Sequence, residues 1–382
     1  MDRDRIYRIA RTLNLEGHSD GLHRRQRKVK SRRGTVVSPG PDYVWSMDAH
    51  CKLQLWGIEI YAAIDHYSRC IVWFYIGISA RSAVSVLAQY LQTLSETGHM
   101  PKFLRTDHGT ETTMAAQAHF ELTEDLHSED DPLSFADCFK YGTSKANQRI
   151  EMWWNFMTKA NLASWRAFFE ELSALGQYNS RVFHDRVAHL AIYMPLLRRG
   201  GIQFVDLWNT HSIRSQKERP HTIPGPPEAL YRWPEAYGGG SNQGCKVPNT
   251  LPAQQARVAG FDLEEYLPPT VVAWCRARLA EHFPGTDGMI EDDCVDQIYI
   301  TVDGQQVRLH YAAYLFLRTA IFNHQQAGAE PVLYESEKPL GAWNWQPHPE
   351  VQRYFDYQDI LVNNVNHGIE DPALLAFVAG GI

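Results

Sequence analysis

The sequence has no apolar run long enough to cross a membrane, no recognisable secretory signal and few cysteines. Among its 382 residues the longest apolar stretch, Cys70 to Ala80, falls well short of the roughly 20 residues that a membrane-spanning helix needs. The chain opens with MDRDRIYRIARTLN rather than an apolar segment, so we expect no secretory leader. The scattered cysteines form no CxxC pair, which argues against a disulfide scaffold and a cysteine-based zinc finger. They are Cys51, Cys70, Cys138, Cys245, Cys275 and Cys294. We expect a soluble, intracellular and reduced protein without a membrane partner.

Acidic residues are missing from one segment near the N-terminus, although the whole chain has a net charge of -7. His23 to Arg33 holds seven basic residues and no acidic one, and residues 1–35 have a balance of +7. Residues 251–382 have the opposite balance, -11. A basic arm of this kind binds nucleic-acid phosphates or serves as a nuclear address, although charge alone fits a solvated arm without a partner equally well. Its phosphate-binding candidates are Arg24, Arg25, Arg27, Lys28, Lys30, Arg32 and Arg33.

The chain does contain enough apolar residues for a sizeable core, at 44% hydrophobic, and they recur with the periods of strands and helices. After the turn-like SPGP at 38–41, the pattern predicts strands at 43–50, 57–64, 70–78, 102–106 and 135–141. It predicts helices at 82–97, 111–122, 147–175, 181–198, 202–208, 270–282 and 309–324. The turn DHYSR between the second and third strands indicates a hairpin. This order of elements predicts an α/β domain with a mixed sheet flanked by helices.

Composition divides the chain into parts. Residues 220–250 are rich in proline and glycine, which predicts a linker, and the charge balance reverses beyond them. The expected division is a basic N-terminal arm over 1–39, a core over 40–165, a helical extension over 166–219, the linker over 220–250 and a separate acidic C-terminal region over 251–382. DNA repels a region with a charge of -11, so we expect that region to meet a protein partner or to mask the basic arm.

Three acidic residues stand where a carboxylate suggests chemistry. Asp48 lies inside the apolar strand YVWSMDAH, where a charge is unfavourable unless it is paired or metal-bound. Asp107 ends a strand at a DHG turn, and Glu151 follows the polar run SKANQR at the start of a helix. Acids from three separate elements can bind hard divalent cations, which activate a water or hydroxyl for phosphoryl transfer. Taken singly, Asp107 also fits a turn cap and Glu151 a surface position.

Four short motifs follow one another along the chain, and a WNTHSIR stretch closes the region at 208–214. The motifs are WSMDAH, IYAAIDHYSR, LRTDHGTE and SKANQRIEMWW. Their order resembles the retroviral-integrase-like catalytic core. The chain is similar to the DDE group of integrases and transposases, in particular to the integrase-core proteins of eukaryotic mobile elements and their domesticated descendants. The resemblance covers about residues 22–230, roughly half of the chain, and it implies a ribonuclease H-like fold.

The resemblance also implies roles for the site residues. The three acids become a catalytic triad that holds two Mg²⁺ or Mn²⁺ ions, with Asn147 and Gln148 beside it at the DNA end. The implied activity is end nicking and strand transfer on DNA, by a homo-oligomer in the nucleus. Because the acids repel phosphate, nearby cations are needed to hold DNA, and Lys145, Arg149 and Lys159 flank the third acid.

Two features depart from the retroviral pattern, and two other functions stay open. The 43 residues between Asp107 and Glu151 exceed the usual separation, which fits an acidic insert at 123–132. No HH-CC zinc motif precedes Asp48 in this sequence. One alternative is a domesticated, non-catalytic DNA-binding or protein-interaction protein. Another is a ribonuclease H-like nuclease, which uses the same triad on RNA or hybrid duplexes.

Other conspicuous residues near the acids have simpler explanations. Asp65 begins the DHYSR turn, where Asp commonly accepts backbone hydrogen bonds. His50 shares a strand face with the first acid and is expected to be a hydrogen-bonded packing residue. Glu111 suits the N-terminal end of a helix, where the dipole favours an acid. Trp153 and Trp154 are expected to pack in a helix core.

Overall fold

The computed structural model describes residues 38–107, 110–128, 133–141, 147–215, 222–237, 239–283, 298–302, 304–336 and 346–356. All of these belong to one compact unit, residues 38–382, and residues 1–37 form another. The basic arm predicted over 1–39 lies outside the described residues except for its last two positions, and Lys145 lies outside them as well. Within the ranges given, no helix is long and apolar enough to span a membrane.

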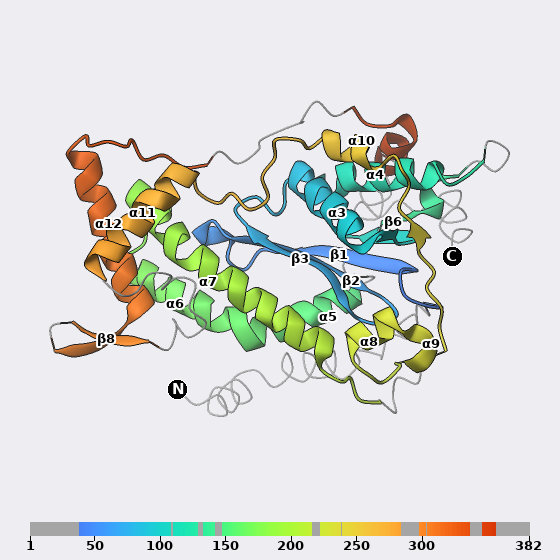
Figure 1. Ribbon diagram of the computed structural model, residues 1–382, viewed down its shortest axis with the longest axis horizontal. Coiled ribbons are helices and arrows are strands. Elements are labelled where there is room, and N and C mark those ends of the chain that lie inside the picture. Colours follow the sequence, from blue (N-terminus) through green and yellow to red (C-terminus); the bar gives the residue numbers. More distant parts are fainter. Residues whose placement is uncertain are drawn as a thin grey trace, which may run out of the picture. The chain divides into compact units, whose positions relative to one another are not determined.

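A five-stranded mixed sheet forms the centre of the fold, in the order β3-β2-β1-β5-β6 (Figure 1). Its strands are β1 (Val44–His50), β2 (Glu59–Asp65), β3 (Ile71–Gly77), β5 (Phe103–Thr106) and β6 (Phe139–Tyr141). The first three strands pair antiparallel, whereas β5 pairs parallel with both β1 and β6. The prediction of a ribonuclease H-like mixed sheet flanked by helices is confirmed.

Alternate side chains of β1 face opposite sides of the sheet. The helices that flank it are α3 (Ala83–Thr97), α4 (Thr113–Glu124), α5 (Gln148–Met157) and α7 (Phe183–Thr210). Trp45 and Met47 are fully buried in a cluster with α3 and α4. Asp48 and His50 face the other side, where they form hydrogen bonds with α5 and the residue that follows it. One strand therefore fills a core on one face and presents a carboxylate on the other.

Helix α3 shows how local sequence sets the ends of an element. Ser82 precedes the helix, and its hydroxyl oxygen accepts a hydrogen bond from the backbone N–H of Ser85, which satisfies one of the free donors of the first turn. Gly98 follows the helix in the left-handed conformation, with φ of 69°, a conformation that glycine adopts without strain. These two residues account for the agreement with the predicted helix over 82–97.

The long helix predicted over 147–175 is interrupted by one irregular segment. α5 continues into a π-helical segment (Thr158–Leu162) and then into α6 (Ala163–Ala174). Backbone hydrogen bonds therefore shift register shortly after Glu151. Such π-segments occur frequently at functional sites.

Helix α7 is continuous where the sequence predicted two helices, over 181–198 and 202–208. The predicted division was wrong, and it falls at residues 199–201, where Gly200 and Gly201 lie. At Gly201 an added Cβ would come within 2.7 Å of Phe74 Cε1 on β3. The glycine therefore allows the helix to approach the sheet closely.

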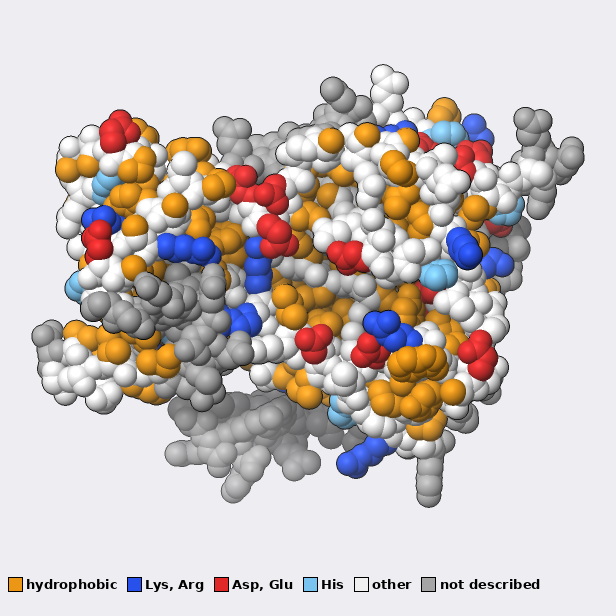
Figure 2. Space-filling model, in the orientation of Figure 1, with side chains coloured by type: hydrophobic (Ala, Val, Ile, Leu, Met, Phe, Trp, Pro, Cys, Tyr) orange, Lys and Arg blue, Asp and Glu red, His pale blue; other side chains and the backbone are white. Residues whose placement is uncertain are grey.

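The segment predicted as a linker, 220–250, packs on the core in its described residues. It contains α8 (Pro227–Arg232), α9 (Pro234–Tyr237) and β7 (Cys245–Lys246), and β7 pairs with β4 (His99–Met100). Tyr231 Oη donates a hydrogen bond to Asp42 Oδ1 at 2.6 Å, and Asn242 Nδ2 donates one to Asp42 Oδ2 at 2.7 Å. Apolar side chains gather over α8 and α9 on the face shown in Figure 2. Trp233, between these two helices, and Tyr237, the last residue of α9, are exposed. Hydrogen bonds thus hold a segment that its composition alone marks as irregular.

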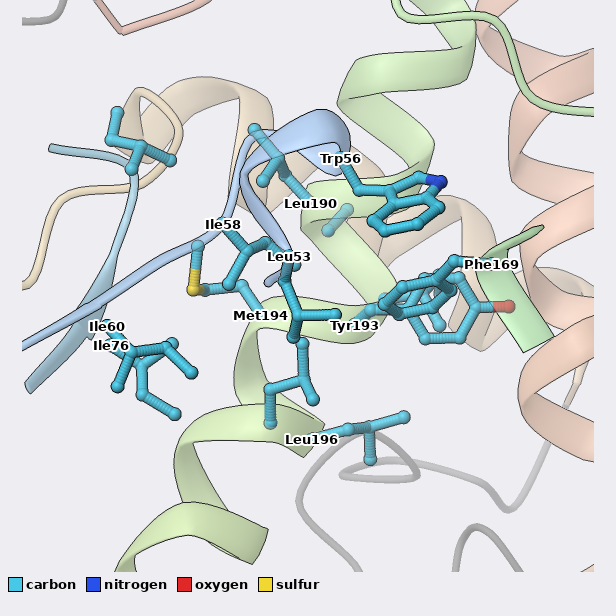
Figure 3. Packing of buried hydrophobic residues seen from close by; sticks show 14 of the residues in the cluster. Leu53, Trp56, Ile58, Ile60, Ile76, Phe169, Leu190, Tyr193, Met194 and Leu196 are labelled. Carbon is cyan, nitrogen blue, oxygen red and sulfur yellow. The ribbon is translucent and has the colours of Figure 1, made fainter. Parts of the chain in front are cut away.

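The described part of the C-terminal region shares its core with the sheet. Its elements are α10 (Leu251–Ala256), α11 (Pro269–His282), β8 (Tyr299–Val302), β9 (Gln305–Arg308) and α12 (Leu309–Gln326). α11 and α12 bury Val271 and Leu317 in one cluster with β2 and α7. Figure 3 shows part of this cluster, where the ring of Phe169 lies 5.7 Å from that of Trp56 and 5.0 Å from that of Tyr193. The reversal of charge after residue 250 therefore does not coincide with a new core among these residues, and the domain boundaries stay a prediction.

Candidate active site

Strands β1 and β5 bring two of the three predicted acids side by side. The strands pair in parallel, with Ser46 opposite Arg105. Counting two residues further along each strand places Asp48 beside Asp107, and both lie on the same face because side chains alternate. Asp107 directly follows the last residue of β5. The two carboxylates therefore meet where the parallel pairing ends.

Helix α5 brings the third acid to the same face. It packs on β1 and β2, and Asn147, just before its first residue, donates its Nδ2–H to the carbonyl of Met47 at 3.0 Å. Trp154 donates its Nε1–H to Asp48 Oδ2 at 3.0 Å. Glu151 and Trp154 are three residues apart and so share one side of the helix. The hydrogen bond to Asp48 therefore fixes the side of α5 that carries Glu151 toward the acids.

The Asp48 carboxylate is buried and held at both oxygens. Only 8% of the residue is exposed. Oδ1 accepts the backbone N–H of Ala49 at 2.8 Å, and Oδ2 accepts the indole of Trp154. Burial first, and then the charges of Asp107 and Glu151, raise the pKa of Asp48 from 3.8 to about 7, although the two hydrogen bonds lower it. The side chain is held in a fixed orientation in surroundings that disfavour its charge.

Glu151 is less buried than Asp48. Partial burial, followed by the charge of Asp107, raises the pKa of Glu151, and the nearby Lys52 ammonium lowers it. Each of the three acids thus interacts electrostatically with at least one of the others. Carboxylates that repel one another bind protons or cations more readily than isolated ones.

The donor chemistry of the three acids fits a hard divalent cation. Mg²⁺ and Mn²⁺ prefer carboxylate oxygens, and the triad offers these from three separate elements. Among the described residues, no three His, Cys, Asp or Glu side chains are grouped closely enough to share one ion. The suitability of the three acids for a divalent cation therefore rests on their carboxylate oxygens and on their position at one face of the sheet. It also rests on their mutual repulsion, which contributes to the raised pKa of Asp48.

The residues predicted to contact DNA fall into two groups. Gln148, the first residue of α5, and Lys159 in the π-helical segment are exposed, and Arg149 is half-buried. Asn147 is only 1% exposed, and its Oδ1 is buried without a hydrogen-bond partner among the described residues. Because Asn147 is buried and bonded to Met47, it links the start of α5 to β1.

The simpler explanations for Asp65 and His50 are confirmed. Asp65 is fully buried and accepts hydrogen bonds from Asp42 N at 2.9 Å and from both the N–H and the hydroxyl of Ser68 at 2.7 Å. His50 Nε2 shares a hydrogen bond with the hydroxyl of Thr158 at 3.1 Å. Burial, assisted by the charge of Lys52, lowers the pKa of His50 to about 4. Both residues hold the framework around the acids.

Two residues near the acids were missed or undervalued from the sequence. Lys52 is exposed just after β1 and interacts electrostatically with Glu151. The sequence does carry a signal, because a lysine four residues beyond Asp48 follows the same strand end. The pKa of Glu111 is raised by burial and by the charges of Asp107 and Glu59. Glu111 therefore lies within electrostatic reach of the acid group.

Comparison with known proteins gives one family. Residues 36–224 match the family model described as "Integrase core domain". That range begins before β1, contains all three acids and ends just before α8. No curated protein matches the chain.

Proposed function

The chain belongs to the integrase core domain family through residues 36–224, and on this premise we propose that it nicks DNA ends and transfers them to another duplex. The observation that carries the proposal is the placement of Asp48, Asp107 and Glu151 on one sheet face, within electrostatic reach of one another. Polynucleotidyl transfer needs such a set of carboxylates to hold divalent cations, and the cations offset the negative charge of the attacked phosphodiester. The same proposal assigns the protein to the nucleus and to a homo-oligomer.

The three acids are the proposed ligands of two divalent ions, Mg²⁺ or Mn²⁺. When bound, the ions supply activation of a water or 3′-hydroxyl and stabilisation of the leaving oxygen. Asp48 is the ligand with the least freedom, since the backbone of Ala49 and the indole of Trp154 each occupy one of its oxygens. Asp107 and Glu151, which are half-buried, face solvent on the side from which DNA arrives.

Contacts to the DNA backbone are proposed for the exposed polar residues around the acids. Gln148, Arg149 and Lys159 lie on α5 or directly after it, and Lys52 lies beyond the end of β1. Positive groups at these positions offset the repulsion between the acids and the phosphates. Lys145 and the basic arm are proposed to add contacts of the same kind. Asn147 is proposed to act through the position of α5.

The proposal is tested with three end-labelled duplexes of one sequence, made as DNA–DNA, RNA–DNA and RNA–RNA. The purified full chain is incubated with each in Mg²⁺ or Mn²⁺, and the products are separated by length. We expect shortened and lengthened products from DNA–DNA, which report nicking and strand transfer. Cleavage confined to the hybrid would support the ribonuclease H-like alternative. The absence of any product with each metal would contradict the proposal and favour a non-catalytic protein.

Trp154→Phe is expected to weaken divalent-metal binding by about 10-fold, the lower end of the usual effect of removing a group that orients a ligand. Phenylalanine keeps a ring to stack on His50, whose centroid lies 4.8 Å from that of Trp154, but it removes the donor to Asp48 Oδ2. The measurement is Mn²⁺ affinity by calorimetry, with the melting temperature as a check on folding.

A matched control stands next to Trp154 in the chain. The Trp153 side chain is also fully buried, and its Nε1 has no hydrogen-bond partner among the described residues. Trp153→Phe removes the same atoms without removing a bond, so its Mn²⁺ affinity should match that of the wild type. Equal weakening in both variants would assign the effect to packing and contradict an orienting role for Trp154.

A further inference from the structure

A cluster of positive side chains lies on the outer strands of the sheet. This β5–β6 cation patch consists of Lys102, Arg105 and Lys140, with the rings of Tyr43 and Phe103 between them. Lys102 is exposed, and the other four residues are half-buried. Lys102 and Arg105 come from β5 or the residue before it, and Lys140 comes from β6. None of these three cations was among the DNA contacts predicted from the sequence.

The strand register and the rings hold the three cations together. Arg105 is the register partner of Lys140 on the neighbouring strand. Lys140 Nζ lies 4.8 Å from the centroid of the Phe103 ring, and Lys102 Nζ lies 5.8 Å from the same ring. Phe103 in turn makes an edge contact with Tyr43 at 5.3 Å. An aromatic face attracts cations. The Phe103 ring therefore offsets part of the repulsion between the two lysine ammonium groups beside it.

The positive charge of the patch is largely uncompensated within the described residues. None of the three side chains forms an ion pair there. Lys140 Nζ donates a hydrogen bond to the carbonyl of Ala136 at 2.8 Å, and Arg105 Nε is buried without a hydrogen-bond partner in the described part of the chain. The charge of Asp137 acts on Lys140, and the Asp137 carboxylate also accepts a hydrogen bond from the backbone N–H of Ser134. A patch of this kind has a favourable site for an external anion.

Two cations of the patch, Arg105 and its register partner Lys140, lie on the same sheet face as the proposed catalytic acids, and Lys102 lies just before the start of β5. Arg105 precedes Asp107 by two residues on β5, so their side chains point to the same side. Arg105 is also the register partner of Ser46, two residues before Asp48. Burial, followed by the charges of Arg149 on α5 and of Arg105, holds the pKa of His66 well below its usual range. The cations and the acids are thus neighbours along two strands.

We propose that the β5–β6 cation patch binds the phosphate backbone of duplex DNA and leads it along β5 to the acids. The inference rests on the proposed function for its substrate, but it concerns binding and not chemistry. Three cations on two neighbouring strands and at the start of one of them offer several contacts to the phosphates of one backbone. The contacts would fix the position of the duplex and would not read its sequence.

The test compares two triple variants of the full chain without divalent metal. The patch variant is Lys102→Gln, Arg105→Gln and Lys140→Gln. The control is Arg166→Gln, Arg232→Gln and Arg278→Gln, which removes the same charge from exposed helix surfaces where each arginine pairs with an acid on its own helix. Binding to a labelled 30-bp duplex is measured by fluorescence anisotropy over a series of salt concentrations.

We expect the patch variant to lower the slope of log affinity against log salt by about 2 to 3, since each phosphate contact contributes about 0.9. The control should keep the wild-type slope. The single variant Lys102→Gln, at an exposed position, should lower the slope by about 1. It replaces the triple variant in the test if the triple variant fails to fold. An unchanged slope in the patch variant, with tight binding by the wild type, would overturn the inference and leave the proposed function standing. Loss of binding in the patch variant, with no nicking by the wild type, would support the inference and contradict the proposed function.

Discussion

Asp48→Asn, Asp107→Asn and Glu151→Gln are each expected to lower metal-dependent DNA nicking on the order of 10³-fold or more, and the double and triple variants should be no worse than the worst single one. In the proposed mechanism the acids act as one unit, and with one charge missing the remaining two would no longer hold both ions. Each substitution keeps the size and shape of the side chain. The measurement is the initial rate of nicking of a labelled duplex at saturating Mn²⁺.

Asp65→Asn is the matched control, because it also removes a buried carboxylate from the same sheet. Asp65 accepts three hydrogen bonds from N–H and hydroxyl donors, and an amide group cannot accept all of them in the same orientation. The variant should lose stability, and its nicking rate per folded molecule should stay close to that of the wild type. A rate loss as large as that of Asp107→Asn would place Asp65 in the chemistry and contradict the assignment.

Asp48→Asn is expected to stabilise the metal-free chain at neutral pH, by an amount on the order of a few kcal/mol. The pKa of Asp48 rises from 3.8 to about 7 in the folded chain, so the folded state holds this proton more tightly than the unfolded state. The carboxyl group therefore lowers stability progressively from about pH 4 to pH 7 and by its full amount above pH 7. Removing the charge reverses that loss. The amide oxygen still accepts a bond from Trp154, and the lost bond from the backbone N–H of Ala49 offsets part of the gain.

The stabilisation is measured as the difference in unfolding free energy between variant and wild type, by urea titration in chelator at several pH values. It should be near zero below pH 4, grow up to pH 7 and stay constant beyond it. Contributions from other buried acids, such as Asp65, are present in both proteins and cancel in the difference. A variant that is less stable than the wild type at pH 8 would show that the Asp48 charge is well accommodated without metal.

The sheet and its acids were predictable because their signals are local. The apolar strands and the DHYSR turn identify the hairpin. Asp48 stands out because a charge is unexpected in the strand VWSMDAH. Asp107 stands out because it follows a strand and precedes a glycine. Order along the chain then connects these two with Glu151.

Contacts between distant residues were not predictable in the same way. The hydrogen bond from Trp154 to Asp48 joins residues 106 positions apart, and the one from Asn242 to Asp42 joins residues 200 positions apart. No local sequence pattern predicts either bond. The sequence around Gly200 and Gly201 does not show that α7 is continuous there. The role of Gly201 becomes clear only from its contact with Phe74 on β3, which lies far away in the sequence. The β5–β6 cation patch is likewise formed by strand pairing.

The most direct test of the proposed function uses the wild type and Asp107→Asn in parallel. Both are freed of metal with a chelator, checked for folding and incubated with an end-labelled duplex before Mg²⁺ or Mn²⁺ is added back. The account predicts nicked and joined products from the wild type only after metal is added, and none from Asp107→Asn. A well-folded Asp107→Asn protein with undiminished metal-dependent nicking would contradict it.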